Sequence, residues 1–120
     1  MGVEYFLVNQ TKKECIGFQH MDGSKAREIA GNPAQAALVS WYMLKNQGDS
    51  IQFVSDTNDD WPFSKGSKKD LDDYKDVTSK YIALLIEQGI LENSGMLYVD
   101  EDDPNNVYVL NLKNVWQNNA

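Results

Sequence analysis

The chain has 120 residues, 42% hydrophobic and 11% aromatic, which is the composition of one ordinary globular domain and excludes intrinsic disorder. Its net charge of −7 opposes contact with nucleic-acid phosphates. Its longest apolar run, residues 81–86, is far shorter than the roughly 20 residues of a membrane-spanning helix. We therefore expect one compact, soluble domain over residues 1–120 that binds neither nucleic acid nor membrane.

The first two predicted strands form a hairpin. Residues 4–9 and 14–19 are rich in aromatic and branched side chains and are separated by a polar, turn-like stretch. A short helix is then predicted over residues 25–30, with Ser24 as its N-cap. The beginning of the chain therefore predicts strand, strand and short helix.

A long helix is predicted over residues 33–47. Asn32 is a favoured N-cap residue, Pro33 suits the first helical position, and Gly48 suits the position just after the end. Apolar side chains occur on every side of this helix, Leu44 among them. We therefore expect the helix to be buried on most sides.

The second half predicts a strand, a helix and another hairpin. Residues 50–55 have the pattern of a strand, and residues 56–70 lack periodicity and predict a long surface loop. A second long helix is predicted over residues 74–88. The second hairpin is expected to pair residues 96–99 with residues 107–112 around an acidic tip.

The order of these elements predicts an α+β fold. Strands and helices do not alternate strictly, which argues against a doubly wound parallel sheet. We expect an antiparallel or mixed sheet built from the two hairpins and a central strand over residues 50–55. Two long helices and one short helix would pack against it.

The acidic charge is concentrated in the second part of the chain. Residues 1–48 carry 4 acidic and 5 basic side chains, whereas residues 49–120 carry 14 acidic and 6 basic side chains. Such a surface attracts a basic protein partner over long range. Acidity also keeps a small protein soluble, and that simpler role requires no partner.

Cys15 is the only cysteine and His20 the only histidine, so an internal disulfide and cysteine- or histidine-based zinc sites are excluded by number. A lone cysteine and the lack of a signal-peptide pattern predict a cytoplasmic protein. Cys15 and His20 would point to opposite faces of an extended strand, which argues against a catalytic group formed with Asp22. We therefore expect no catalytic residue.

Metal sites and carboxylate chemistry have candidate residues but incomplete motifs. The acidic stretch that begins at Asp56 starts like a calcium loop, but Trp61 replaces the required glycine and Ser67 the required glutamate. We expect no metal and no cofactor. Adjacent aspartates, such as Asp72 with Asp73, leave open a carboxylate- or divalent-cation-dependent enzyme.

Two aromatic residues interrupt the polar stretch at residues 56–70. Trp61 and Phe63 lie among seven acidic and four basic side chains over residues 56–76. An aromatic residue in such a place either fills the core or is an exposed anchor for a partner, and charged surroundings are typical of binding hot spots. Both interpretations remain open from the sequence.

The last 40 or so residues resemble the end of a winged-helix domain. A helix over residues 81–88 is followed by Gly89, Ile90 and Leu91 and then by the predicted hairpin. A wing that contacts DNA carries basic residues, whereas this one carries acidic residues at its tip. The resemblance therefore implies a regulatory or protein-interaction module.

The whole chain also resembles the small acidic immunity proteins of bacterial toxin systems, including contact-dependent inhibition. The shared features are its size, the opening run at residues 5–9, the single domain, and acidic and aromatic residues on loops. This resemblance implies a non-catalytic inhibitor that neutralises a basic toxin, often a nuclease. The predicted partner-facing residues are Asp59, Asp60, Trp61, Phe63, Asp72 and Asp73, with Asp100, Glu101, Asp102 and Asp103 as the second choice.

Overall fold

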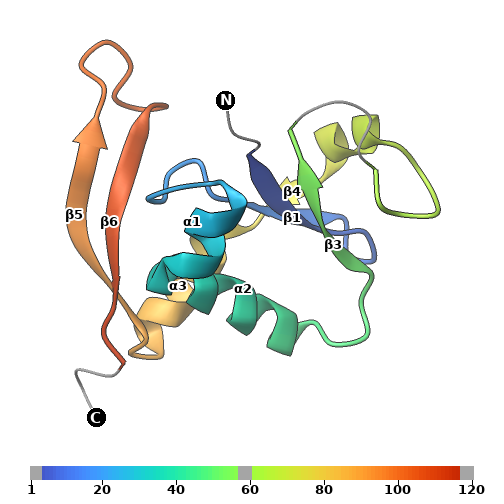
Figure 1. Ribbon diagram of the computed structural model, residues 1–120, viewed down its shortest axis with the longest axis horizontal. Helices are drawn as coiled ribbons and strands as arrows, with labels where there is room; N and C mark the ends of the chain where they lie inside the picture. Colours follow the sequence, from blue (N-terminus) through green and yellow to red (C-terminus); the bar gives the residue numbers. More distant parts are fainter. Residues whose placement is uncertain (1–3, 57–60, 117–120) are drawn as a thin grey trace.

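A computed structural model describes residues 4–56 and 61–116 of the protein (Figure 1). The α+β class is confirmed, because strands and helices coexist without regular alternation. The elements are β1 (Tyr5–Asn9), β2 (Glu14–Gly17), α1 (Ala26–Gly31), α2 (Pro33–Lys45), β3 (Ile51–Ser55), the 3₁₀ helix η1 (Lys68–Asp73), β4 (Lys75–Asp76), α3 (Thr78–Glu87), β5 (Leu91–Val99) and β6 (Tyr108–Asn114).

The strands form two sheets, and the two hairpins do not share one. A four-stranded sheet has the order β3–β1–β2–β4, with β1 antiparallel to both neighbours and β4 parallel to β2. The second hairpin, β5–β6, is a separate two-stranded sheet. The strand expected at the centre, β3, lies at an edge. Strand β1 takes an inner position because Leu7 and Val8, which point to opposite faces, are both buried.

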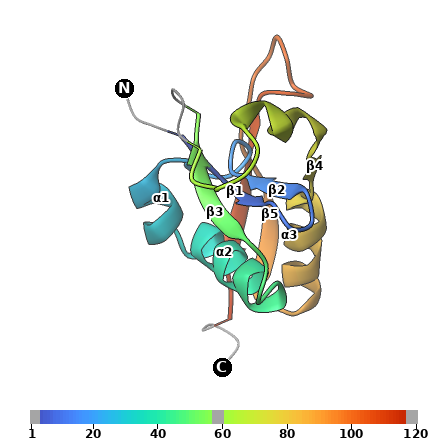
Figure 2. The same cartoon turned by 90° about the vertical axis from the view of Figure 1, so that its right-hand side faces the viewer.

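Helices α2 and α3 cover one face of the four-stranded sheet and enclose the main core (Figure 2). Leu38 and Tyr42 of α2 and Leu85 of α3 have no exposed surface. Helix α2 is less buried than its composition predicts, because Met43 and Leu44 are 43% and 61% exposed. Its neighbours contact the side that carries Leu38 and Tyr42, so the opposite side faces solvent.

A second, smaller core lies on the other face of the same sheet. Val8 and Val54 are buried there beneath Phe63, with Trp61 and Tyr74 packed against them. Residues 61–74, which the sequence predicts mostly as a surface loop, therefore cover a sheet face and include the helix η1 (Figure 2). The segment assumes this position because the sheet is apolar on both faces and one helical layer covers only one of them.

Helix α3 begins at Thr78, later than the predicted start at residue 74. The preceding residues pair with β2 instead: the Lys75 N–H donates to the Lys13 carbonyl at 3.0 Å, and the Val77 N–H donates to the Cys15 carbonyl at 2.9 Å. A carboxylate oxygen of Asp76 then accepts the Thr78 N–H at 2.9 Å, which favours a helix start there. Long-range strand pairing thus overrides the local helical pattern.

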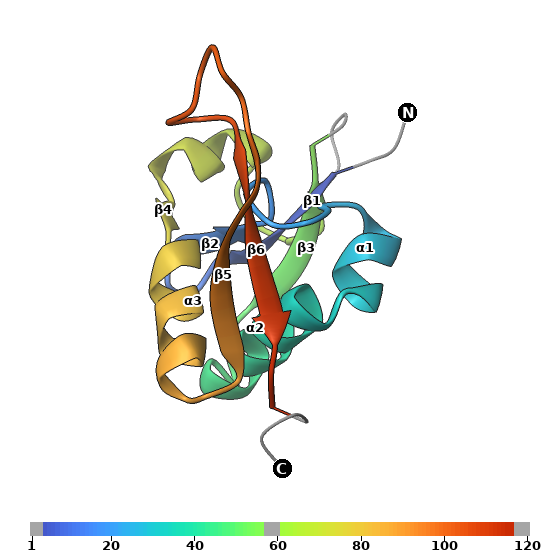
Figure 3. The same ribbon diagram turned by 90° about the vertical axis from the view of Figure 1, so that its left-hand side faces the viewer.

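The β5–β6 hairpin is longer than predicted and packs by its base on α2 and α3. The ring of His20 stacks on Tyr108, with centroids 3.8 Å apart, and the Leu110 N–H donates to the His20 carbonyl at 2.8 Å. These contacts fix β6 to the loop that follows β2. Beyond them the tip extends past the other described elements (Figures 1 and 3). No helix in the described ranges is long and apolar enough to cross a membrane.

Candidate partner-binding surface

The outer half of the β5–β6 hairpin exposes an unusual run of apolar side chains. Met96, Leu97, Tyr98 and Val99 are 55%, 52%, 53% and 41% exposed. Tyr98 and Val99 pair with β6 in regular register and so point to opposite faces, which means that neither face of the hairpin is covered at their level. Val107, which immediately precedes β6, is also exposed. We call residues 96–107 the hairpin arm.

Four acidic residues follow the apolar run without interruption. The loop is held by its own hydrogen bonds: the Asp100 N–H donates to the Val107 carbonyl at 2.9 Å, and Asp100 Oδ1 accepts the Asp102 N–H at 2.8 Å. Glu101, Asp102 and Asp103 are exposed. Within residues 4–56 and 61–116 the salt bridge found joins Lys12 to Asp49, so no basic side chain neutralises the acids of the tip. The tip is therefore an ordered, uncompensated negative charge.

The structure does not bring the predicted site residues together on one surface. Asp72 and Asp73 are exposed on η1, which lies far from the hairpin arm along the long axis of the molecule (Figure 1). Asp59 and Asp60 lie outside the described residues. The acidic tip, the second choice from the sequence, is the group that adjoins an exposed apolar surface.

Of the two interpretations that the sequence left open for Phe63 and Trp61, the structure favours the filling of a core. Phe63 is only 9% exposed and packs against Val8 and Val54. Trp61 is half-buried beside it, with ring centroids 5.0 Å apart, and its indole Nε1–H donates to the Lys65 carbonyl at 2.8 Å. Both rings close the second core.

Cys15 and His20 do not form a catalytic pair. Cys15 packs in the second core, whereas the His20 ring stacks on Tyr108 and its Nδ1 lies 3.0 Å from the Tyr108 carbonyl oxygen. In the part of the chain that the structure describes, no three His, Cys, Asp or Glu side chains are grouped so as to hold a metal ion.

The hydroxyl of the buried Tyr42 donates a hydrogen bond to Glu14 at 2.6 Å, and this contact connects α2 to β2.

Cys15 is expected to react slowly with alkylating agents at neutral pH. Burial raises the pKa of its thiol to about 11, and the negative charges of Asp76 and Glu14 add to the effect. The reactive thiolate is therefore scarce at pH 7. The rate of iodoacetamide labelling, measured against free cysteine from pH 7 to pH 10, should stay far below that of the free amino acid. Rapid labelling at pH 7 would contradict this environment for Cys15.

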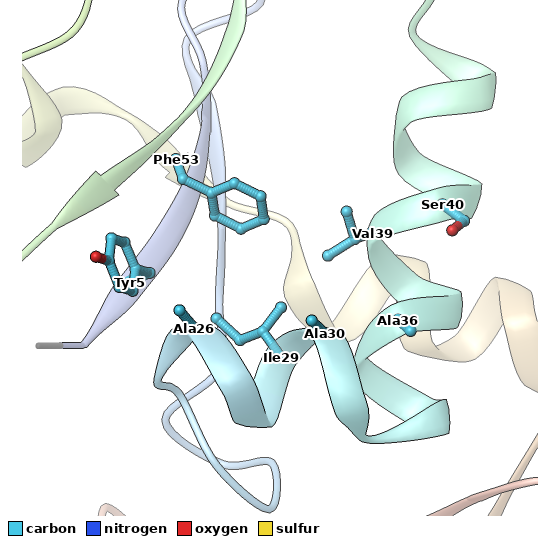
Figure 4. Close-up of a pocket in the computed structure, with 8 residues that line it drawn as sticks. All are labelled: Tyr5, Ala26, Ile29, Ala30, Ala36, Val39, Ser40 and Phe53. Carbon is cyan, nitrogen blue, oxygen red and sulfur yellow. The ribbon is translucent and has the colours of Figure 1, made fainter. Parts of the chain in front are cut away.

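An apolar groove lies elsewhere on the surface, between α1, α2, β1 and β3. It has a volume of about 480 Å³ and is lined by Tyr5, Ile29, Val39 and Phe53, together with alanines of the two helices (Figure 4). This groove was not predicted from the sequence. The available signal was the small side chains of Ala26, Ala30 and Ala36, which leave space between packed helices and a sheet.

No family model, curated protein or solved structure matches this chain. The resemblances to winged-helix domains and to immunity proteins therefore depend on the residues quoted for them. The hairpin arm combines exposed apolar side chains with acidic side chains that no salt bridge neutralises within residues 4–56 and 61–116.

Proposed function

We propose that this protein is a non-catalytic, cytoplasmic inhibitor of the immunity-protein type, which binds a basic protein partner such as a toxin nuclease through its hairpin arm. The observation that carries the proposal is the continuity of the exposed run at Met96–Val99 with the acidic tip. Large exposed apolar patches beside charged residues are typical of protein-binding sites. A projecting hairpin also suits a concave, basic active site.

The two chemical parts of the hairpin arm have different roles. Burying the exposed part of its four apolar side chains would contribute roughly 4 kcal/mol, since a fully buried one contributes about 1.5–3 kcal/mol. Exposed ion pairs contribute only about 0.2–1 kcal/mol each, but they accelerate association. Association itself costs roughly 4–15 kcal/mol. Tight binding therefore needs contacts in addition to the hairpin arm, and the acids mainly set the association rate.

The test begins with capture of a partner by the immobilised protein from cells of the source organism, followed by mass spectrometry. We expect a stoichiometric basic protein whose retention falls at high salt. Binding kinetics to that protein are then measured for a variant carrying Asp100→Asn, Glu101→Gln, Asp102→Asn and Asp103→Asn. These amides keep the side-chain shapes and remove the charge. The association rate should fall about tenfold at low salt and change little at high salt.

The control carries Asp72→Asn and Asp73→Asn, which removes two charges from η1 instead of four from the tip. Its association rate should stay within about twofold of the unmodified protein, because η1 lies away from the hairpin arm. A larger effect of the η1 variant than of the tip variant would assign the interface to η1. If both variants bind normally at low salt, the acidity serves solubility and the inhibitor proposal fails.

One alternative has a structural observation in its favour. Helix α3 is followed directly by the β5–β6 hairpin, which is the order of elements at the end of a winged-helix domain. A salt-dependent mobility shift of duplex DNA by the purified protein would favour a DNA-binding regulatory module. With four acids at the tip, we expect no shift at physiological salt.

A further inference from the structure

The helices that cover one face of the four-stranded sheet leave part of β3 exposed on that face. Leu7 of β1 and Phe53 of β3 are directly opposed in the sheet, so their side chains lie on the same face. Leu7 is 2% exposed and belongs to the main core, whereas Phe53 is 40% exposed. Phe53 touches the ring of Tyr5 edge to face, with centroids 6.5 Å apart. The helical layer therefore ends between two neighbouring strands, and an aromatic surface remains beside α1 and α2.

Helix α1 is held beside this exposed surface without filling the space next to it. The helix packs against α2, and Ile29 is its buried residue. The residues just before it are fixed to β1, because the Tyr5 N–H donates to the Ser24 carbonyl at 2.9 Å and the Ser24 hydroxyl donates to Glu4 at 2.8 Å. The space between α1 and β3 is therefore part of the folded structure. Sites for small molecules are usually formed in advance in this way.

The apolar groove in this space has the size and chemistry of a small-molecule site. Its volume of about 480 Å³ lies within the range of roughly 300–1,000 Å³ that such sites occupy. An apolar cavity of about 150 Å³ holds one benzene molecule, so the groove has space for about two or three rings. The eight described residues that line it carry no charge. Its lining therefore offers neither a cation nor an anion for a charged ligand to pair with.

Water in the groove has few side-chain hydrogen-bond partners. Figure 4 shows Phe53, Ile29 and Val39 directed towards one space, whereas the hydroxyl of Tyr5 points away from that space. Ser40 is the other lining residue with a hydroxyl group. Weakly held water is displaced favourably by an apolar group. The groove therefore favours a ligand that offers apolar surface in place of hydrogen bonds.

We propose that this groove binds an uncharged, apolar small molecule of about two or three rings, which lies between α1 and β3. The ligand contacts the Phe53 ring on the side of the sheet and Ile29 and Val39 on the side of the helices. An anionic ligand is disfavoured, because the described lining includes no basic side chain and the protein carries a net charge of −7. The site shares no residue with the hairpin arm, so it is separate from the proposed partner interface.

The experiment titrates the purified full chain into a dilute solution of phenylnaphthylamine, an uncharged molecule of three aromatic rings that fluoresces more strongly in apolar surroundings. We expect saturable binding of one molecule per chain with a Kd on the order of 0.1 mM, the affinity typical of a ligand of this size. Anilinonaphthalenesulfonate has the same rings and adds a sulfonate. It should bind about tenfold more weakly or less, because its charge would lose water without gaining a partner.

Ala30→Leu is the blocking variant and Ala83→Leu is the matched control. Both residues are exposed alanines in helices, but Ala30 lines the groove and Ala83 lies on α3 outside it. The larger side chain at residue 30 takes up space in the groove, so Ala30→Leu should weaken binding of phenylnaphthylamine about tenfold. Ala83→Leu should change the Kd by less than about twofold. Phe53→Ala removes one wall and should weaken binding about threefold to tenfold. Circular dichroism checks that all three variants fold.

Amide NMR spectra locate the bound phenylnaphthylamine. The largest shifts are expected at Ile29, Val39 and Phe53, with the hairpin arm unchanged. The absence of saturable binding would overturn the proposal, and so would binding that Ala30→Leu and Phe53→Ala leave unchanged. Shifts confined to the hairpin arm, with binding lost in Leu97→Lys, would assign the dye to the arm and overturn it as well. Equal affinity for the sulfonated dye would overturn the ligand class.

Discussion

Replacing Phe63 with alanine is expected to lower the free energy of unfolding by about 3 kcal/mol, at the lower end of the range for buried phenylalanine because the site lies near the surface. Phe63 is 9% exposed, and its ring fills the space above Val8 and Val54. The substitution removes these contacts and leaves Trp61 without the neighbour on which it packs. Urea unfolding followed by circular dichroism measures the change.

Trp116→Ala is the matched control, since it also removes an aromatic ring but from a side chain that is 60% exposed. Its effect should be within about 0.5 kcal/mol. Should Phe63→Ala leave stability unchanged and weaken partner binding instead, the ring would be an exposed anchor and its burial in the second core would be wrong. The two roles of Phe63 considered from the sequence are thus separated by one pair of variants.

Replacing Asn9 with alanine is expected to lower the free energy of unfolding at pH 7 by about 3 kcal/mol, because a fully buried side chain with two hydrogen bonds is lost. Asn9 has no exposed surface. Its Nδ2–H donates to Asp49 at 2.8 Å, and its Oδ1 accepts the Lys12 N–H at 3.0 Å. It thereby joins the end of β1 to the turn after it and to the approach to β3.

The effect of Asn9→Ala should shrink as the pH falls. The hydrogen bond from Asn9 lowers the pKa of Asp49 below its ordinary value of 3.8, and Lys12 lowers it further. A lowered pKa contributes stability above the ordinary value, and that contribution is lost as the pH falls through the pKa of the folded state. In Asn9→Ala the pKa of Asp49 rises towards 3.8, so less of this contribution remains to be lost.

Urea titrations of both proteins at pH 7 and near pH 3 measure this dependence. Asn105→Ala serves as the control, because its side chain is exposed and makes no hydrogen bond within the described residues. It should alter stability by less than about 0.5 kcal/mol at either pH. An equal loss for Asn9→Ala at both pH values would show that the charge of Asp49 has no part in it.

Several helix limits could be predicted because they depend on residues adjacent in the chain. Pro33 begins α2 as predicted, whereas the helix ends at Lys45, before the predicted residue 47, and Gly48, with φ of +91°, lies in the turn that follows. Asn32 is the N-cap residue of α2 as predicted, but its side chain donates to the Asp22 carbonyl and makes no hydrogen bond to the first turn of the helix. Limits set by long-range pairing, such as the start of α3 after β4, had no local signal.

The candidate site also has one part that could be predicted from the sequence and one part that could not. The acidic tip was visible in the sequence because charge is a property of the residues themselves. The exposure of Met96–Val99 was not, because an apolar strand is as consistent with a buried hairpin as with a projecting one. The groove requires the positions of four separate elements, and the edge position of β3 depends on how distant strands pair, so no local pattern could predict either.

By itself, the sequence determined the α+β class, the position of most elements and the acidic character of the second half. Composition, periodicity and turn residues act over short distances along the chain, and they suffice for those properties. Only the tertiary structure decided that Phe63 closes a second core, that β3 is an edge strand and that the hairpin arm is exposed. Burial and exposure depend on which distant segments meet, because a side chain is removed from water by its neighbours in space.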